Sequence, residues 1–173
     1  HYSGKKLVRA IALEKEVYER ASRVLTFSQW VKDSMVRDFH LPEDKVRVAR
    51  PGVNFDIPEN LDKHYQDPII LFVGRDFERK GGPTLLKAFR MIRRSIRNAR
   101  LVIAGCNPPV DEEGVIIKGL IPREREHEIK QLYESAAVFA LPSRFEPFGL
   151  VFLEAMAYKV PCLGTAICAM PEI

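Results

Sequence analysis

Two glutamates, Glu146 and Glu154, stand eight positions apart in the stretch RFEPFGLVFLEAMAYKVP. The segment GLVFLEAMAY, at 149–158, is apolar on nearly all sides, which predicts a buried helix. A lone carboxylate in such a helix is costly to desolvate without a partner. Glu154 therefore either lies on a face that opens into a crevice or pairs with an internal base that the sequence does not identify. Because carboxylates accept hydrogen bonds from hydroxyls, we expect the two glutamates to flank a bound molecule that carries sugars.

The turn between these glutamates is expected to bind an anion. Pro147 disfavours the helical conformation at Glu146, so the helix is predicted to begin near Phe148 or Gly149. The N–H groups of Phe148, Gly149 and Leu150 then lack partners within the helix, and the helix dipole favours negative charge beside them. Gly149 has no side chain, so a ligand can approach the backbone closely. An ordinary capped helix start is the alternative interpretation.

A second candidate anion site, GRDFERKGG at 74–82, directly follows the apolar run IILFV. Gly74 allows a sharp turn off a strand, and Arg75 and Lys80 offer fixed positive charge to a phosphate or diphosphate. The alternative is a surface loop whose cations contact only water. Since two anion-receiving features follow two separate apolar runs, the pattern favours a bound diphosphate. The loop has neither the Walker spacing nor the Gly-x-Gly-x-x-Gly turn, which argues against a P-loop NTPase and against bound NAD.

The elements that must position these loops alternate along the second part of the chain. Short apolar runs alternating with helices of about 10 to 15 residues predict a parallel sheet covered on both faces. The predicted strands are IILFV, LVIAG, VIIKG, VFAL and VPCLG, and the predicted helices span 84–98, 124–136 and 149–159. The expected fold class is α/β, a doubly wound, Rossmann-like parallel sheet. Such sheets bind ligands at the carboxyl ends of their strands, where both candidate loops lie.

The first 50 residues offer only two short predicted strands, VLTFS and KVRVA, beside two helical segments. These are too few partners for an independent sheet, so we expect the end of a domain whose beginning lies outside this chain. Residues 50–68 contain three prolines and no sustained apolar period, which marks a connecting segment. We therefore predict one domain boundary, between 1–56 and 57–173.

Composition narrows the class of protein. No apolar stretch approaches the roughly 20 residues needed to span a bilayer, and HYSGKKLVRA lacks the apolar core of a signal peptide. The three cysteines are odd in number and show no Cys-x-x-Cys spacing, which favours reduced thiols. The four histidines are scattered, so no metal site is expected. We expect a soluble, cytoplasmic protein.

Positive charge is concentrated in one predicted helix. The net charge of +4 is too small by itself to imply nucleic-acid binding. Six basic residues crowd into 14 positions: Lys87, Arg90, Arg93, Arg94, Arg97 and Arg100. A solvated helix face is one interpretation, and a patch for an anionic partner such as a membrane surface is the other.

Together these motifs resemble the family 4 retaining glycosyltransferases. The resemblance rests on a Gly-Arg turn followed by Lys-Gly, and on Pro-Ser-x-x-Glu-x-Phe-Gly with a second glutamate eight residues after the first. It extends through LVIAG, KGLIP, LYESAAVFALPS, LEAMA and MPEI, with TFSQW and RPGVNFD upstream. It implies the GT-B fold of two facing Rossmann-like domains, of which this chain would be a truncated C-terminal half. Residues 57–173 would be the nucleotide-sugar (donor) domain, incomplete at its C-terminus, and 1–56 the remnant of the acceptor-side domain and hinge.

The resemblance also implies residue roles. Arg75 and Lys80 would stabilise the diphosphate leaving group. Glu146 and the amides of 148–150 would hold the donor sugar and the distal phosphate, and Glu154 would accept hydrogen bonds from the ribose hydroxyls. The residues that fall where the family contacts the base are Lys118, Gly119 and Leu120. Sugar transfer would need neither a metal nor another cofactor, because the two cations act in place of a divalent ion, and it would retain the anomeric configuration.

The chain departs from the family pattern where Lys159 replaces a usual glycine and where ICAMPEI lacks paired glycines, so the sugar-side loop is expected to differ. Without an acceptor domain, this chain alone is expected to be inactive. The implied partners are a nucleotide-sugar donor and an unknown saccharide or lipid acceptor, without nucleic acid, and a peripheral membrane contact stays open. Two alternatives remain: another GT-B enzyme, such as a sugar epimerase or phosphorylase, and a non-catalytic basic module that binds anionic lipid or nucleic acid.

Overall fold

The computed structural model describes residues 4–54 and 56–173. The chain divides into two compact units. The N-terminal unit contains residues 1–51 together with Glu172, and the sheet unit contains residues 52–171 together with Ile173. The division falls inside the proline-containing segment that the sequence marks as a connection. Among the described residues, no helix combines the length and the apolar character that a bilayer crossing requires.

The N-terminal unit is small. Its elements are α1 (Gly4–Arg20), β1 (Val24–Thr26), α2 (Gln29–Phe39) and β2 (Val46–Val48). The two strands pair in parallel, with Val24 opposite Val46, and these two residues form a buried cluster with Leu41. The hydroxyl of Ser28 accepts a hydrogen bond from the backbone N–H of Val31 at 3.2 Å, which caps α2 at its N-terminus.

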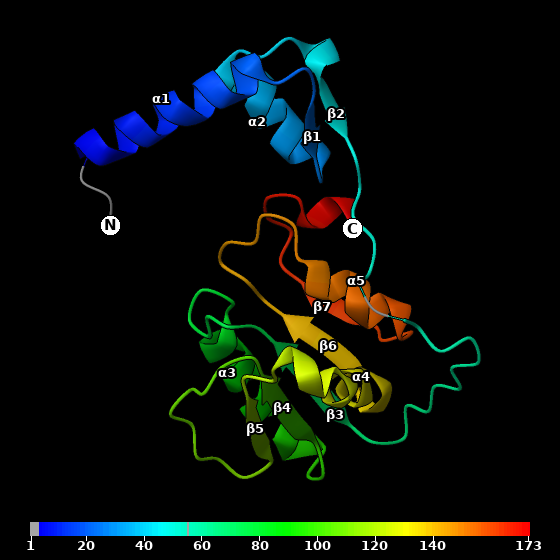
Figure 1. Cartoon of the computed structure of the whole chain (residues 1–173). Coiled ribbons are helices and arrows are strands. Elements are labelled where there is room, and N and C mark those ends of the chain that lie inside the picture. The colour runs from blue at the N-terminus through cyan, green and yellow to red at the C-terminus, as the bar shows by residue number, and fades with distance from the viewer. Residues whose placement is uncertain (1–3, 55) are drawn as a thin grey trace. The chain divides into compact units, whose positions relative to one another are not determined.

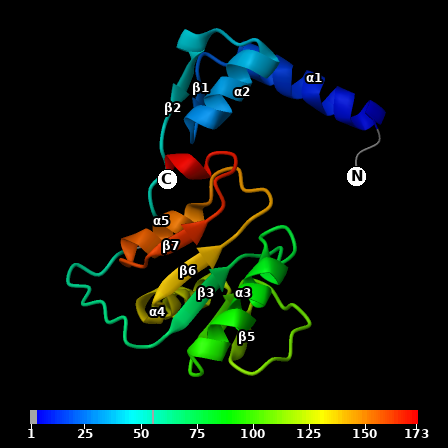
Figure 2. The ribbon, with the colours of Figure 1, turned by 180° about the vertical axis from the view of Figure 1, so that it is seen from behind.

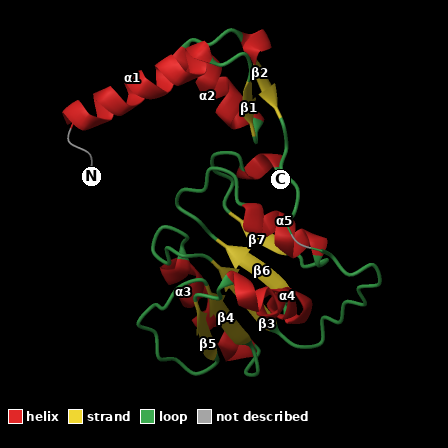
Figure 3. Cartoon of the chain, in the orientation of Figure 1, coloured by secondary structure: helices red, strands yellow, loops and turns green. Residues whose placement is uncertain are grey.

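The sheet unit is a five-stranded parallel sheet between helices. Its strands are β3 (Ile69–Val73), β4 (Arg100–Ala104), β5 (Val115–Gly119), β6 (Val138–Leu141) and β7 (Cys162–Gly164), in the spatial order β5-β4-β3-β6-β7. Its helices are α3 (Gly82–Ser95), α4 (Glu126–Ser135) and α5 (Leu150–Ala157). Helix α4 lies in front of the sheet in Figure 1 and α3 lies in front of it in the reverse view of Figure 2, so helices cover both faces. Figure 3 shows the same alternation of strand and helix along the unit.

The strand sequences explain this layering. The central strands β3 and β4 read as continuous apolar runs, and Leu71, Phe72, Leu101 and Ile103 are fully buried, as expected for a sheet covered on both faces. The edge strand β5 instead alternates between half-buried and exposed residues over most of its length. The predicted α/β class is therefore confirmed.

Strand order decides where a ligand can bind. β3 pairs with β4 on one side and with β6 on the other. The chain leaves β3 for α3 and leaves β6 for α5, helices that a right-handed crossover places on opposite faces. The loops after β3 and β6 therefore leave the sheet towards opposite faces, at a topological switch point. Sheets of this kind bind ligands in the crevice between two such loops.

The element boundaries differ from the predicted ones by a few residues. The runs IILFV, VIIKG and VFAL coincide with β3, β5 and β6, whereas β4 ends at Ala104 because Gly105 turns off the strand with φ 91°. Helix α3 begins at Gly82 rather than at residue 84, and α5 begins at Leu150, close to the predicted start. Pro83 lies in the first turn of α3, where its missing N–H costs no helical hydrogen bond.

Gly81 is the N-cap residue of α3, with φ 79°, and a Cβ built on it would lie 1.8 Å from the carbonyl oxygen of Pro142. We expect Gly81→Ala to lower the free energy of unfolding by at least about 2 kcal/mol, because the left-handed conformation alone costs an alanine about 1–2 kcal/mol and the clash adds to it. Urea denaturation measures the change. Gly52→Ala is the control, since no atom lies within 4 Å of its added Cβ; equal stability of the two variants would contradict the prediction.

The positive charge of the basic cluster at residues 87–100 is partly neutralised by acidic side chains. Arg90 donates to Glu112 at 2.8 Å, Arg93 to Glu113 at 2.6 Å, and Arg100 lies 3.4 Å from Asp67. Half of the six clustered cations therefore have acidic partners. Arg90 and Arg93 belong to α3, whereas Arg100 is the first residue of β4. The pairs made by Arg90 and Arg93 therefore reduce the charge that α3 presents to a polyanion.

Candidate functional site

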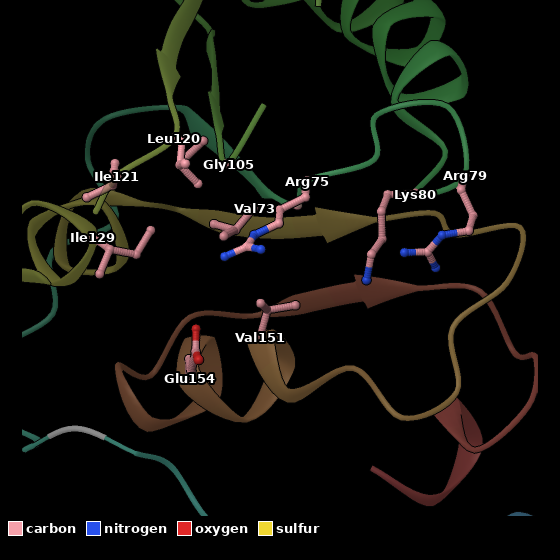
Figure 4. A pocket seen from close by; sticks show the side chains of 12 residues that line it. Val73, Arg75, Arg79, Lys80, Gly105, Leu120, Ile121, Ile129, Val151 and Glu154 are labelled. Carbon is pink, nitrogen blue, oxygen red and sulfur yellow. The ribbon is translucent and has the colours of Figure 1, made fainter. Parts of the chain in front are cut away.

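A cavity of about 510 Å³ opens at the carboxyl ends of the central strands. This volume is typical of small-molecule sites. The lining residues come from the loops after β3, β4 and β5 and from helices α4 and α5: Val73, Gly74, Arg75, Arg79, Lys80, Ala104, Gly105, Leu120, Ile121, Ile129, Val151 and Glu154 (Figure 4). Both segments that the sequence singled out thus contribute side chains to one cavity.

Three cations line one wall of the cavity. Figure 4 shows the nitrogen atoms of Arg75, Arg79 and Lys80 extending from the β3–α3 loop towards the space above α5, where Glu154 lies. The loop is held to the sheet because the N–H of Gly74 donates to the carbonyl of Ala104 at 2.9 Å. Fixed guanidinium and ammonium groups of this kind suit a phosphate or diphosphate.

Lys80 and Glu146 form an ion pair that joins the two candidate loops. The side chains are 14% and 7% exposed, so both charges are largely withdrawn from water and each compensates the other. The motifs predicted a phosphate contact for Lys80 and a sugar contact for Glu146, and their spacing did not indicate that the two side chains meet. An ammonium group has three donors, so Lys80 can hold Glu146 and a phosphate oxygen at once.

Arg79 is a functional candidate that the sequence motifs did not single out. Its Nη1 donates to the carbonyl of Phe145 at 2.7 Å, and its own carbonyl accepts from the N–H of Arg144 at 2.9 Å. Its Nε also donates to Asp76 at 3.3 Å. Arg79 therefore ties the β3–α3 loop to the loop that carries Glu146, and its position next to Lys80 in GRDFERKGG was the available signal.

Glu154 is the half-buried carboxylate that the apolar helix left unexplained. It lines the cavity, and its Oε2 accepts a hydrogen bond from the hydroxyl of Tyr133 at 2.7 Å. Both sequence alternatives were therefore partly right: Glu154 does face the crevice, and it does have an internal partner, although that partner is a tyrosine and not a base. Burial raises the pKa of Glu154, the Tyr133 hydroxyl lowers it, and the negative charge of Glu126 raises it.

Comparison with known proteins shows which family the chain belongs to. The family described as "Glycosyl transferases group 1" matches residues 54–173. The chain belongs to this glycosyltransferase family. It is 33% identical over 175 residues to an uncharacterized glycosyltransferase of Methanocaldococcus jannaschii, covering 87% of this chain and 44% of the relative. It is 27% identical over 188 residues to the alpha-maltose-1-phosphate synthase of Mycolicibacterium smegmatis, covering 93% and 48%.

Solved structures of glycosyltransferases share the fold. The glycosyltransferase WaaG, "involved in lipopolysaccharide biosynthesis", matches with a TM-score of 0.71 at 20% identity, over 91% of this chain and 50% of WaaG. A TarM mutant in complex with UDP and other ligands matches with a TM-score of 0.76 at 16% identity, over 95% of this chain and 34% of TarM. The sheet unit thus has the Rossmann-like architecture of GT-B enzymes. The chain spans about half the length of the curated relatives it matches.

The N-terminal end of α5 lies beside the cavity without lining it. Gly149 is the N-cap of α5 with φ 86°, close to where the sequence predicted the helix to start. A Cβ on Gly149 would lie 3.0 Å from both Met170 Sδ and Phe152 Cδ2, so the backbone is closely packed there. The cavity meets α5 further along, at Val151 and Glu154. Phe148, Gly149 and Leu150 are not among its lining residues.

Of residues 118–120, which the family resemblance places at the nucleotide base, one reaches the cavity. Leu120 lines the cavity and is 58% exposed. Lys118 and Gly119 do not line the cavity. Gly119 is buried with φ 65°, and its carbonyl accepts from the N–H of Gly105 at 2.7 Å, which fixes the turn that presents Leu120. Ile121 and Ile129 add to this apolar end of the cavity.

Metal-binding side chains do not gather in the part of the chain that the structure describes. Residues 4–54 and 56–173 contain no group of three or more His, Cys, Asp or Glu residues placed to hold a metal ion. The cations that line the cavity are the charged groups available to an anionic ligand there.

Proposed function

We propose that the cavity is the donor site of a glycosyltransferase that transfers a sugar from a nucleotide-diphosphate sugar to an acceptor. The observation that carries this proposal is the arrangement of Arg75, Arg79 and Lys80 opposite Glu154 across one cavity at the switch point of the sheet (Figure 4). A diphosphate fits the cationic wall, a ribose fits the carboxylate, and a base fits the apolar end at Leu120 and Ile121. Structural neighbours described as UDP complexes support the same class of ligand.

The chemistry assigned to this site is leaving-group stabilisation. As the bond between the sugar and the diphosphate breaks, negative charge grows on the phosphate oxygens, and Arg75 and Lys80 stabilise it in place of a divalent metal ion. Glu146 and the amides at the mouth of α5 hold the donor sugar and the distal phosphate. The acceptor, a saccharide or a lipid, attacks an oxocarbenium-like sugar from the leaving-group side, so the anomeric configuration is retained.

The non-catalytic alternative, a basic module for anionic lipid or nucleic acid, fits less well. Three of the clustered arginines pair with Glu112, Glu113 and Asp67. A polyanion would also be repelled by Glu154, whereas a nucleotide sugar uses that carboxylate. A peripheral membrane contact by the rest of the basic helix is compatible with sugar transfer to a lipid acceptor.

Ligand-dependent stability tests the proposal. We expect one of the UDP-, GDP- and ADP-sugars to raise the melting temperature of the chain, and Glu154→Ala to remove most of that shift, because a ligand stabilises only the state that binds it. Glu134→Ala is the control, since Glu134 is an exposed glutamate on α4. If no nucleotide sugar raises the melting temperature and vesicles of anionic lipid or DNA do, the basic-module alternative is correct; stabilisation by sugar phosphate alone would indicate a phosphorylase.

A further inference from the structure

The side chain that reaches Glu154 from the protein interior is Tyr133. Its hydroxyl donates to Oε2 of Glu154 at 2.7 Å, and the tyrosine is fully buried. Tyr133 belongs to α4 and Glu154 to α5, so the contact joins two helices across 21 positions of sequence. Tyr133 does not line the cavity, and so it acts on a ligand only through Glu154.

The packing around Tyr133 fixes where its hydroxyl lies. Its ring stacks on Tyr158 with centroids 5.8 Å apart and tilts against Phe139 at 6.3 Å. The ammonium group of Lys63 donates to the backbone carbonyls of Tyr133 and Glu134, at 2.6 Å each, and so holds the C-terminal end of α4. A donor placed by the core in this way removes rotational freedom from the carboxylate that accepts from it.

We propose that Tyr133 is a positioning residue that orients the Glu154 carboxylate towards the ribose hydroxyls of the donor and thereby makes the site selective for ribonucleotides over deoxyribonucleotides. This inference rests on the proposed function. A carboxylate has two oxygens, and Tyr133 engages one of them, which leaves acceptor capacity for the ligand. Figure 4 shows the carboxylate of Glu154 directed into the cavity, opposite Arg75.

The hydroxyl also supports the charged form of Glu154. Burial raises the pKa of this carboxyl, and the Tyr133 hydrogen bond opposes that change. Glu126 on α4 raises the pKa further, and the charged side chains that line the same cavity as Glu154 are Arg75, Arg79 and Lys80. Without the Tyr133 hydroxyl, Glu154 takes up a proton at a higher pH and becomes a weaker acceptor for the ribose.

Comparing the binding of a ribonucleotide with that of its deoxy counterparts tests the inference. Isothermal titration gives the dissociation constants of UDP, GDP and ADP; the tightest is then compared with its 2′-deoxy and 3′-deoxy counterparts. A hydroxyl donating to a carboxylate predicts that the wild-type chain prefers the ribonucleotide by about ten- to a hundredfold. We expect Tyr133→Phe to lower that preference about three- to tenfold, because it weakens binding of the ribonucleotide more than binding of either deoxynucleotide, which has one hydroxyl fewer to donate to Glu154.

Tyr158→Phe is the matched control, because Tyr158 is equally buried and packs on Tyr133 but does not line the cavity. It should keep the wild-type preference. An unchanged preference in Tyr133→Phe overturns the inference, and so does an equal loss in Tyr158→Phe. If the wild-type chain binds ribo- and deoxynucleotides equally, this inference alone fails; if it binds no nucleotide, the proposed function fails.

The pH dependence gives a second measurement that needs no variant. Because the pKa of Glu154 is raised above its ordinary value, the wild-type preference for the ribonucleotide should fall as the pH falls through that raised pKa. The phosphates titrate alike in both ligands, so their effect cancels from the ratio. In Tyr133→Phe the fall should begin at a higher pH. A preference that does not change with pH in the wild-type chain contradicts the role of Glu154 and overturns the inference.

Discussion

Replacing Lys80 with methionine is expected to lower the free energy of unfolding by about 3 to 5 kcal/mol, because it leaves the buried Glu146 carboxylate without its partner. Methionine keeps the alkyl part of the side chain, so the change isolates the charge. Both members of the pair are largely withdrawn from water. Urea denaturation of the chain measures the loss.

A double-mutant cycle separates the ion pair from local packing. Glu146→Gln removes the charge that Lys80→Met leaves unpaired, so the double variant should regain more than half of the stability lost by Lys80→Met. Lys87→Met controls for the loss of a lysine at an exposed position of α3 and should stay within about 0.5 kcal/mol of the wild type. Additive losses in the cycle would mean that the pair contributes nothing.

Arg75→Ala is expected to weaken binding of a nucleoside diphosphate by about ten- to a hundredfold, since it removes charge-assisted hydrogen bonds to the phosphates. In sugar transfer the same loss should lower the rate by about 10² to 10³, because the negative charge on the leaving group is greatest in the transition state. Arg75 is exposed, so the variant should remain folded. Isothermal titration with the tightest of UDP, GDP and ADP measures the affinity.

The matching nucleoside without phosphates is the control ligand, because Arg75 should contribute nothing to its binding. Arg97→Ala controls for a general loss of positive charge, as Arg97 is an exposed arginine outside the cavity. If Arg75→Ala weakens the nucleoside as much as the diphosphate, Arg75 is not the phosphate ligand. If Arg97→Ala has the same effect as Arg75→Ala, the attraction is nonspecific.

The fold followed from local patterns in the sequence. Apolar runs predicted β3 and β6 without error, because a strand covered on both faces must be apolar throughout. The edge strand β5 also coincides with its predicted run, although its residues alternate between half-buried and exposed. The start of α3 differs from the predicted one by two residues, and the N-cap residue Gly81 packs so closely against the Pro142 carbonyl that a Cβ there would clash with it. That contact joins two loops far apart in sequence, and a local pattern does not contain it.

The candidate site was predictable only in outline. Parallel strands end at one edge of a sheet, so the sequence alone placed Arg75, Lys80 and Glu154 on loops and a helix that meet at that edge, and all three line the cavity. It also predicted the turn at Gly149. It did not show that the cavity would meet α5 at Val151 and Glu154 instead of at the turn.

By itself, then, the sequence determined the α/β class, the order of elements, the family resemblance, and which charged residues follow which strands. Only the tertiary structure decided the partners: Lys80 with Glu146, Arg79 with Phe145, and Tyr133 with Glu154. The first two contacts span 66 residues and exist because β3 pairs with β6, which brings the loops after these strands together. Strand order and side-chain packing are properties of the whole fold, and no spacing along the chain encodes which carboxylate meets which donor.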